Sequence, residues 1–452
     1  METFAAKTVC SSAAGLRSTR TTIVADMLAE HAPRACRRMI PSPGSAFTTI
    51  GTNRRQGNPC RYPEGAPMSL SPTAAADWID QADALQSWLA ALPPDAAIGL
   101  DTEFMRRDTF HPQLALLQLG WNGHHALVDP LAFPIGAALQ PLLGTGDAVT
   151  VMHSASEDLE VLAPLLPAGP RQLFDTQIAA AFVGMGLGVS YRALVAELVG
   201  VDLDKGETRS DWMRRPLTPS QCSYAALDVV YLKTIHEQLA ERLQQRGRSD
   251  WHAQDCDRLK RRVHRESDSQ PQRALRAAAD WRPQAQARLR RLLLWRDSSA
   301  RRLDVPRPWL LDDTLALSLA QQPPATLAEL EQRARGQRAL RSAQRHELFD
   351  VLAPAVTPAE IDATARIPGH PQGAAKQALA AMKQSVDALA VELDLPPGLL
   401  CPRKVLEEYV ITAEWPESLD GWRHDLLHPR LASLLPDRPA TSQPVAKASA
   451  GD

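Results

Sequence analysis

The chain has 452 residues, of which 44% are hydrophobic and 23% charged, and its formal net charge is −2. This length and composition predict a globular protein with two or three domains, each with its own core. No apolar run reaches the roughly 18 residues of a membrane helix and no secretory signal is recognisable, so we expect a cytoplasmic protein without membrane contact. The six cysteines form no C-x-x-C pair and fit neither a disulfide framework nor a zinc site.

The first 67 residues are rich in Ser, Thr, Arg, Gly and Pro and lack the period of a helix or a strand. They carry nine Lys or Arg against four Asp or Glu. We expect residues 1–67 to be a disordered extension or a start-site artefact, with Met68 as the true start. The rival interpretation, a transit peptide, is disfavoured because such peptides avoid acidic residues. Residues 437–452 are expected to form a disordered tail.

Residues 68–260 mix strand and helix patterns. Apolar runs predict strands at 97–104, 114–121, 125–130 and 148–154, helices at about 135–143, 156–166, 175–183 and 190–200, and one long helix from Thr218 to about Arg246. Three consecutive strands with short connections, followed by strands that alternate with helices, predict a mixed sheet flanked by helices.

From about residue 280 the strand patterns disappear, and Leu- and Ala-rich amphipathic segments alternate with Pro-rich turns. This predicts two all-α bundles, at 280–360 and 368–436, divided near TARIPGHPQG. A basic band at 258–302 leads into the first bundle, with fourteen Lys or Arg against four Asp or Glu. Such a band is typical of a phosphate-binding surface and equally of a solvated helix face.

Asp101 and Glu103 stand at the end of a buried apolar run, in AIGLDTEF. Because they are two residues apart on a strand, their side chains project to the same face. Burying charge without a partner costs several kcal/mol, so a partner must neutralise these acids. The D-x-E pattern alone is not specific, since the chain repeats it at Asp158 and Glu160.

Two further segments complete the pattern. VMHSASEDLEVL runs from a predicted strand into a helix and offers His153, Glu157, Asp158 and Glu160. SYAALDVVYL lies on the long predicted helix, where Tyr224 and Asp228 are four residues apart and share a face. Acids at the ends of buried elements, with a phenol one turn from the last of them, predict a site for a divalent metal that prefers oxygen ligands, such as Mg²⁺ or Mn²⁺.

In this order, the segments DTEF, HSASEDLEVL and YAALDVVYL resemble the three exonuclease motifs of the ribonuclease D family, the branch of the DEDD 3′–5′ exonucleases whose last motif carries a tyrosine. The resemblance covers residues 70–250 and implies an α/β ribonuclease H-like exonuclease domain at 68–260. The segment that begins QAQARLRRLLLWRDSSARRLDV is similar to the HRDC domain, and VDALAVELDLPPGLL resembles a second, weaker copy. No Walker A motif is present, which excludes a helicase.

The resemblance implies a role for each matching residue. Two divalent metal ions, Mg²⁺ or Mn²⁺, would be held by four acids, Asp101, Glu103, Asp158 and Asp228. Tyr224 would orient the attacking water. Two residues that follow the first motif would either wedge against the terminal base or pack in the core, namely Phe104 and Met105. Apart from the resemblance, the charge of the basic band predicts that it binds nucleic acid through three of its cations, Arg288, Arg290 and Arg291.

The function that this resemblance implies is metal-dependent exoribonuclease activity, which releases nucleoside 5′-monophosphates from RNA with a free 3′ end. The expected substrates are tRNA precursors and other structured RNAs, and the expected form is a monomer. One alternative is a DNA 3′–5′ exonuclease, because no motif identifies the 2′-hydroxyl. The other is a catalytically silent RNA-binding protein that kept the fold. The complete set of four acids and a tyrosine argues against a silent protein.

Overall fold

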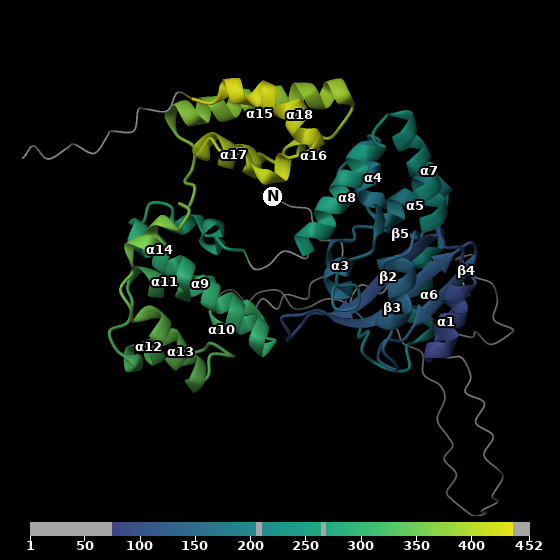
Figure 1. Ribbon diagram of the computed structural model, residues 1–452, viewed down its shortest axis with the longest axis horizontal. Coiled ribbons are helices and arrows are strands. Elements are labelled where there is room, and N and C mark those ends of the chain that lie inside the picture. The colour runs from purple at the N-terminus through teal and green to yellow at the C-terminus, as the bar shows by residue number, and fades with distance from the viewer. Residues whose placement is uncertain (1–74, 205–209, 264–267, 437–452) are drawn as a thin grey trace, which may run out of the picture.

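The computed structural model describes residues 75–204, 210–263 and 268–436 (Figure 1). The predicted extension at 1–67 and the predicted tail at 437–452 lie outside the described residues. Among the residues described, no helix combines the length and the apolar character that crossing a bilayer requires.

A six-stranded mixed sheet forms the centre of the N-terminal domain, with the strand order β1-β4-β3-β2-β5-β6. The strands are β1 Asp77–Ile79, β2 Ala97–Met105, β3 Gln113–Trp121, β4 His124–Val128, β5 Val149–Met152 and β6 Gln172–Asp175. Strand β3 is antiparallel to β2 and to β4, whereas the other pairs are parallel. The predicted mixed sheet is confirmed, although the short strands β1 and β6 had not been predicted.

The hairpin between β3 and β4 follows from its two-residue turn. Asn122 and Gly123 both have positive φ, at 49° and 85°. An Asn-Gly pair with positive φ at both positions is the preferred two-residue hairpin turn, because its twist matches that of the strands. This short turn explains why β2, β3 and β4 are neighbours in sequence and in the sheet.

Helices cover both faces of the sheet. They are α1 Ala82–Ala90, α2 Gly136–Leu139, α3 Ser156–Leu162, α4 Thr176–Phe182, α5 Tyr191–Val199, α6 Pro219–Val230, α7 Leu232–Gln245 and α8 Ser249–Val263. Helix α6 begins with a capping box, in which Thr218 and Gln221 each bond the backbone N–H of the other, and with Pro219 in its first turn.

Two glycines bring α6 close to the central strands. Gly99 on β2 and Gly120 on β3 are direct partners across the sheet. A Cβ atom added at Gly120 would lie 2.8 Å from the carbonyl oxygen of Val229, and one added at Gly99 would lie 3.2 Å from the same atom. Only residues without a side chain therefore allow the end of α6 to approach this pair of strands.

The single long helix predicted from Thr218 to about Arg246 is wrong, because the structure divides it at Tyr231 into α6 and α7. In a continuous helix the N–H of Tyr231 would bond the C=O of Leu227. Here the Tyr191 hydroxyl accepts from the Tyr231 N–H at 3.2 Å and donates to the Leu227 oxygen at 3.1 Å. A side chain inserted between helical hydrogen-bond partners is a known cause of a break.

The helical half contains two bundles that begin in the same way. The first contains α9 Pro283–Leu303, α10 Arg307–Leu310, α11 Asp313–Gln321, α12 Leu327–Arg333, α13 Ser342–Leu352 and α14 Pro358–Asp362; the second contains α15 Gly373–Leu393, α16 Pro397–Leu400, α17 Arg403–Thr412 and α18 Trp422–Leu431. Both α9 and α15 have 21 residues and end at an aspartate with left-handed backbone, Asp304 at φ 48° and Asp394 at φ 50°. The second bundle thus repeats the opening of the first.

The second bundle shares a hydrophobic core with the exonuclease domain. Two buried side chains join them, since Arg423 on α18 donates to both carboxylate oxygens of Asp255 on α8, at 2.6 and 2.7 Å. The Trp422 ring stacks on Trp251 with centroids 4.7 Å apart. Asp394 adds an ion pair with Arg246 at 2.8 Å.

The first bundle meets the exonuclease domain at the loop between β2 and β3. Asp304 Oδ1 accepts from the backbone N–H groups of Phe110 and His111, each at 3.0 Å. The guanidinium groups of Arg301 and Arg307 form cation–π contacts with the Phe110 ring. Their central carbons lie 4.8 and 4.5 Å from the ring centroid. The equivalent aspartates of the two bundles, Asp304 and Asp394, therefore both contact the exonuclease domain.

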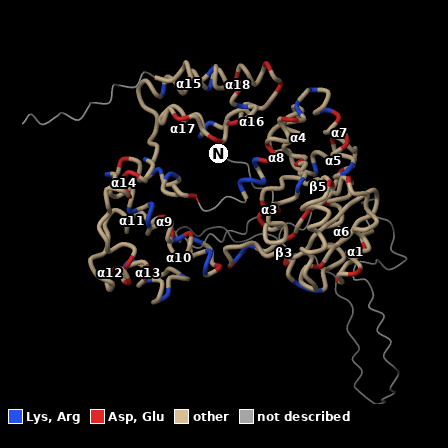
Figure 2. The backbone as a smooth tube through the Cα atoms, in the orientation of Figure 1, with Lys and Arg blue, Asp and Glu red and all other residues tan. Residues whose placement is uncertain are grey.

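These contacts arrange the three parts in a ring (Figure 1). The segment before α9 is joined to the second bundle by two ion pairs, Arg273 with Glu408 and Arg276 with Glu407. Figure 2 shows Lys and Arg at the end of α8 and along α9, which belong to the basic band at 258–302.

Replacing Asp304 with Gly should loosen the contact of the first bundle while sparing helix α9. Glycine adopts the left-handed backbone freely, so only the carboxylate is lost. The amides of Phe110 and His111 then lose their acceptor, and their hydrogen exchange should accelerate by roughly tenfold or more. The matched control is Asp394→Gly, which changes the equivalent residue of the second bundle and should leave these two amides unaffected. Unchanged exchange in Asp304→Gly would show that this hydrogen bond does not hold the loop.

Candidate active site

Strand β2 presents Asp101 and Glu103 on the face that α6 covers. The strand is central and largely buried, with Ile98 and Leu100 fully buried on the opposite face. Asp101 is only 5% exposed, and Glu103 is half-buried. The register between β2 and β3 shifts between Glu103 and Phe104, so the strand changes its pairing directly after the second acid.

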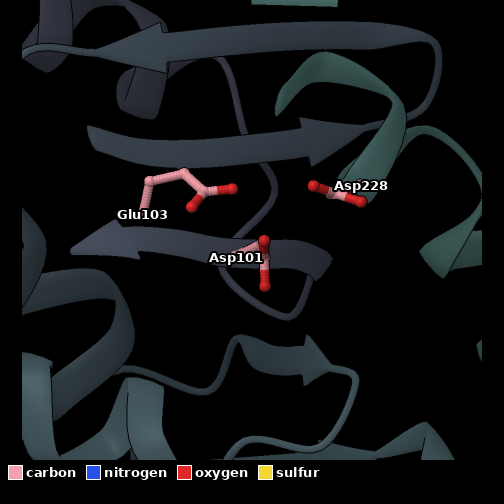
Figure 3. A group of neighbouring side chains, drawn as sticks. All are labelled: Asp101, Glu103 and Asp228. Carbon is pink, nitrogen blue, oxygen red and sulfur yellow. The ribbon is translucent and has the colours of Figure 1, made fainter. Parts of the chain in front are cut away.

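Asp228 joins these two acids from the last turn of α6. Figure 3 shows Asp101 and Glu103 projecting from β2 and Asp228 projecting toward them from the helix. One carboxylate oxygen from each residue lies within 4.8 Å of the others. Clustering three carboxylates at a partly buried position is unfavourable unless positive charge accompanies them. Their oxygen atoms are the ligands that hard divalent cations prefer, so the residues present fit a metal site.

Asp158 lies outside this group of three, on the first turn of α3. It is fully buried, and its Oδ1 accepts a hydrogen bond from the Thr102 hydroxyl at 2.5 Å. Thr102 stands between Asp101 and Glu103, and alternation along the strand directs its side chain to the opposite face. The structure therefore brings three of the four predicted acids together and holds the fourth against the same strand through its threonine.

The start of α3 depends on a buried aspartate that the sequence analysis had missed. Asp175 accepts from the backbone N–H of Ala155 at 2.9 Å, just before α3, and from that of Gln177 at 2.8 Å, in the first turn of α4. Burial raises the pKa of Asp175, and these backbone donors oppose the rise. Asp175 thereby fixes the turn that carries Asp158. The sequence offered only a helix N-cap pattern, DTQ, as an indication.

Tyr224 lies one turn before Asp228 on α6 and is half-buried. Its ring centroid is 6.0 Å from that of Trp212. His153, at the end of β5, has its Nδ1 2.9 Å from the hydroxyl of Thr176. The spacing of Tyr224 and Asp228 on one helix agrees with the sequence analysis.

A second tyrosine, which the sequence analysis did not identify, lies beside the acids. Tyr191 is the first residue of α5, and its hydroxyl bridges the break between α6 and α7. Burial raises the pKa of Tyr191 well above its usual range, and the nearby charges of Asp228 and Asp101 raise it further. Nothing in the segment GVSYRAL indicates this contact, because the partners lie 36 and 40 residues away.

The remaining predicted residues lie outside the acidic cluster. Phe104 and Met105 are half-buried at the end of β2. The three arginines of α9 use their guanidinium groups within the helical half. Arg288 donates to the carbonyl of Ala320, Arg290 to that of Ser269, and Arg291 forms a two-point ion pair with Glu360. A nucleic-acid-binding role for Arg288, Arg290 and Arg291 stays a prediction.

Two family models match the chain. The 3′–5′ exonuclease domain matches residues 76–244, and the HRDC domain matches residues 285–347. The first match contains all four acids and both tyrosines described above. The second covers most of the first bundle.

Ribonucleases D from several bacteria are similar to the chain over most of its length. The enzyme of Xanthomonas oryzae is 44% identical over 360 residues, which cover 79% of this chain and 98% of that protein. The enzyme of Escherichia coli is 31% identical over 376 residues, 79% of this chain and 97% of that protein. The crystal structure of E. coli RNase D, described as an exoribonuclease involved in structured RNA processing, superimposes with a TM-score of 0.69 at 30% identity, covering 80% of this chain and 98% of that one. The chain belongs to the ribonuclease D family of 3′–5′ exoribonucleases.

Proposed function

We propose that this exoribonuclease shortens RNA from the 3′ end at the cluster of Asp101, Glu103 and Asp228 and releases nucleoside 5′-monophosphates. The observation that carries the assignment is the approach of these three carboxylates within 4.8 Å, from a strand and a helix far apart in sequence. The expected substrates are tRNA precursors and other structured RNAs, in keeping with the relatives that the chain resembles. We expect the protein to act as a monomer.

Divalent metal ions are implied by the family, and the acidic cluster is suited to them. We assign one ion to Asp101, Glu103 and Asp228, and a second to Asp101 together with Asp158, directly or through water. Two such ions, Mg²⁺ or Mn²⁺, would supply the positive charge that promotes deprotonation of a water and neutralises the departing 3′ oxygen. The hydrogen bond from Thr102 restrains Asp158 against the strand that carries Asp101 and Glu103.

Tyr224 is assigned to the attacking water. Because it lies one helical turn from Asp228, its phenol and that carboxylate occupy the same side of α6. A phenol hydroxyl can donate one hydrogen bond and accept another, which is what orienting a water requires. Phe104 and Met105, just beyond the register shift of β2, are assigned to the terminal base.

Asp101→Asn and Asp228→Asn should each reduce cleavage of a 3′-labelled RNA to below roughly 1% of wild type, because each removes a ligand charge. The fold should persist, since the change also relieves repulsion among clustered acids. The measurement is mononucleotide release with Mg²⁺ or Mn²⁺, together with thermal unfolding. Asp387→Asn, an exposed acid of the second bundle, is the control. Turnover above a tenth of wild type in either variant would contradict the metal assignment, and a DNA strand of the same sequence tests the preference for RNA.

Tyr224→Phe keeps the ring and deletes only the hydroxyl. If the hydroxyl orients the water, kcat should fall by roughly a hundredfold, while RNA affinity and the unfolding midpoint stay near wild type. Tyr409→Phe, a buried tyrosine of the second bundle, serves as the matched control. If Tyr224→Phe turns over normally, or loses stability without losing kcat, the residue is part of the core only.

A further inference from the structure

The break between α6 and α7 lies directly beside the acidic cluster. Asp228 follows Leu227, whose carbonyl accepts from the Tyr191 hydroxyl, and precedes Tyr231, whose N–H donates to the same hydroxyl. The side chain of Tyr191 thus takes the place of one of the backbone hydrogen bonds that would span Asp228 in a continuous helix, the bond from the Tyr231 N–H to the Leu227 carbonyl. The position of the Asp228 carboxylate depends on the geometry of this turn.

The two hydrogen bonds make the hydroxyl a complete bridge. The distance is 3.1 Å to the Leu227 oxygen, slightly longer than a typical O–H···O bond, and 3.2 Å to the Tyr231 nitrogen, at the upper end of the N–H···O range. The Tyr231 N–H also reaches the carbonyl of Val229, so the Tyr191 hydroxyl is one of two acceptors for this group at the break.

The tyrosine is anchored by a part of the fold that does not include the acids. Tyr191 begins α5, whose N-cap residue Ser190 accepts from the backbone N–H of Ala193 at 3.3 Å. On the other side, its ring lies 5.8 Å from that of His153, which contacts Thr176. Helices α5 and α7 also pack on each other within one hydrophobic core. Because the Tyr191 side chain is held on three sides, its hydroxyl has a fixed position relative to the turn between Leu227 and Tyr231.

We propose that Tyr191 is a positioning residue, whose hydroxyl holds the Leu227–Tyr231 turn open and so directs the Asp228 carboxylate toward Asp101 and Glu103. Without the hydroxyl, the Tyr231 N–H can bond the Leu227 carbonyl, and α6 and α7 can join into one helix. This would rotate Asp228 relative to β2. The inference rests on the proposed metal role of Asp228, and it assigns Tyr191 no contact with the substrate.

The test is the affinity of the full chain for Mn²⁺, measured by electron paramagnetic resonance of the free ion in the absence of RNA. Tyr191→Phe should raise the Kd for Mn²⁺ by roughly tenfold. The reason is that the loss of a group that orients a metal ligand, here the Asp228 carboxylate, typically weakens metal binding by that factor or more. The Mn²⁺ concentration for half-maximal activity should rise by the same factor. At saturating Mn²⁺, kcat should recover to within a few-fold of wild type.

The matched control is Tyr231→Phe, which removes a phenol hydroxyl from the same turn but leaves the backbone N–H that Tyr191 accepts from. Its Mn²⁺ affinity should equal that of wild type. Since Tyr191→Phe keeps the ring, its fold should persist, and thermal unfolding checks this. If that variant does not fold, Tyr191→His, which keeps a polar ring atom, should fold and show weakened Mn²⁺ binding.

Wild-type Mn²⁺ affinity in a folded Tyr191→Phe protein would overturn the positioning role. Asp228→Asn separates this failure from that of the proposed function. If Asp228→Asn loses Mn²⁺ binding while Tyr191→Phe does not, the metal site stands and the positioning role is wrong. If Asp228→Asn binds Mn²⁺ as wild type does, the metal site itself is misassigned and the positioning role falls with it.

Discussion

Three carboxylates that approach within 4.8 Å repel one another, and the structure around them serves to hold them there. Strand β2 supplies two acids on one face because side chains alternate along a strand. Gly99 and Gly120 let α6 approach that face closely enough to add Asp228. Such a cluster is unfavourable in the protein alone and becomes favourable with cations, so metal affinity and fold depend on the same packing.

The helical half is attached to this centre in two unequal ways. The second bundle shares a core with α4 and α7 and adds a buried ion pair, Asp255 with Arg423. The first bundle contacts the loop that follows β2, where the Asp304 carboxylate accepts hydrogen bonds from the backbone N–H groups of Phe110 and His111 at the surface. The Phe110 side chain of the same loop packs against the hydrophobic core of the first bundle. This loop begins directly after the strand that carries the acids, and it therefore connects the bundle with the site.

The predictable parts of the fold were those set by local pattern. The mixed sheet and the pairing of Asp101 with Glu103 followed from the period of a strand, and the pairing of Tyr224 with Asp228 from the period of a helix. The break at Tyr231 could not be predicted, because it depends on a hydroxyl 40 residues away. The density of positive charge in the sequence was also insufficient to predict the contacts of the basic band, since Arg291 pairs with Glu360 inside the first bundle. The number of Lys and Arg residues does not show which of their side chains form ion pairs or hydrogen bonds within the protein.

The most direct test of the account is the location of Mn²⁺ in crystals of the protein, from anomalous scattering. We predict a peak between Asp101, Glu103 and Asp228, about 2.0–2.6 Å from one oxygen of each carboxylate. A peak of this kind would identify the cluster as the metal site without reference to activity. If Mn²⁺ bound elsewhere while the three acids kept their separation, or bound nowhere at concentrations that support cleavage, the central claim would be contradicted.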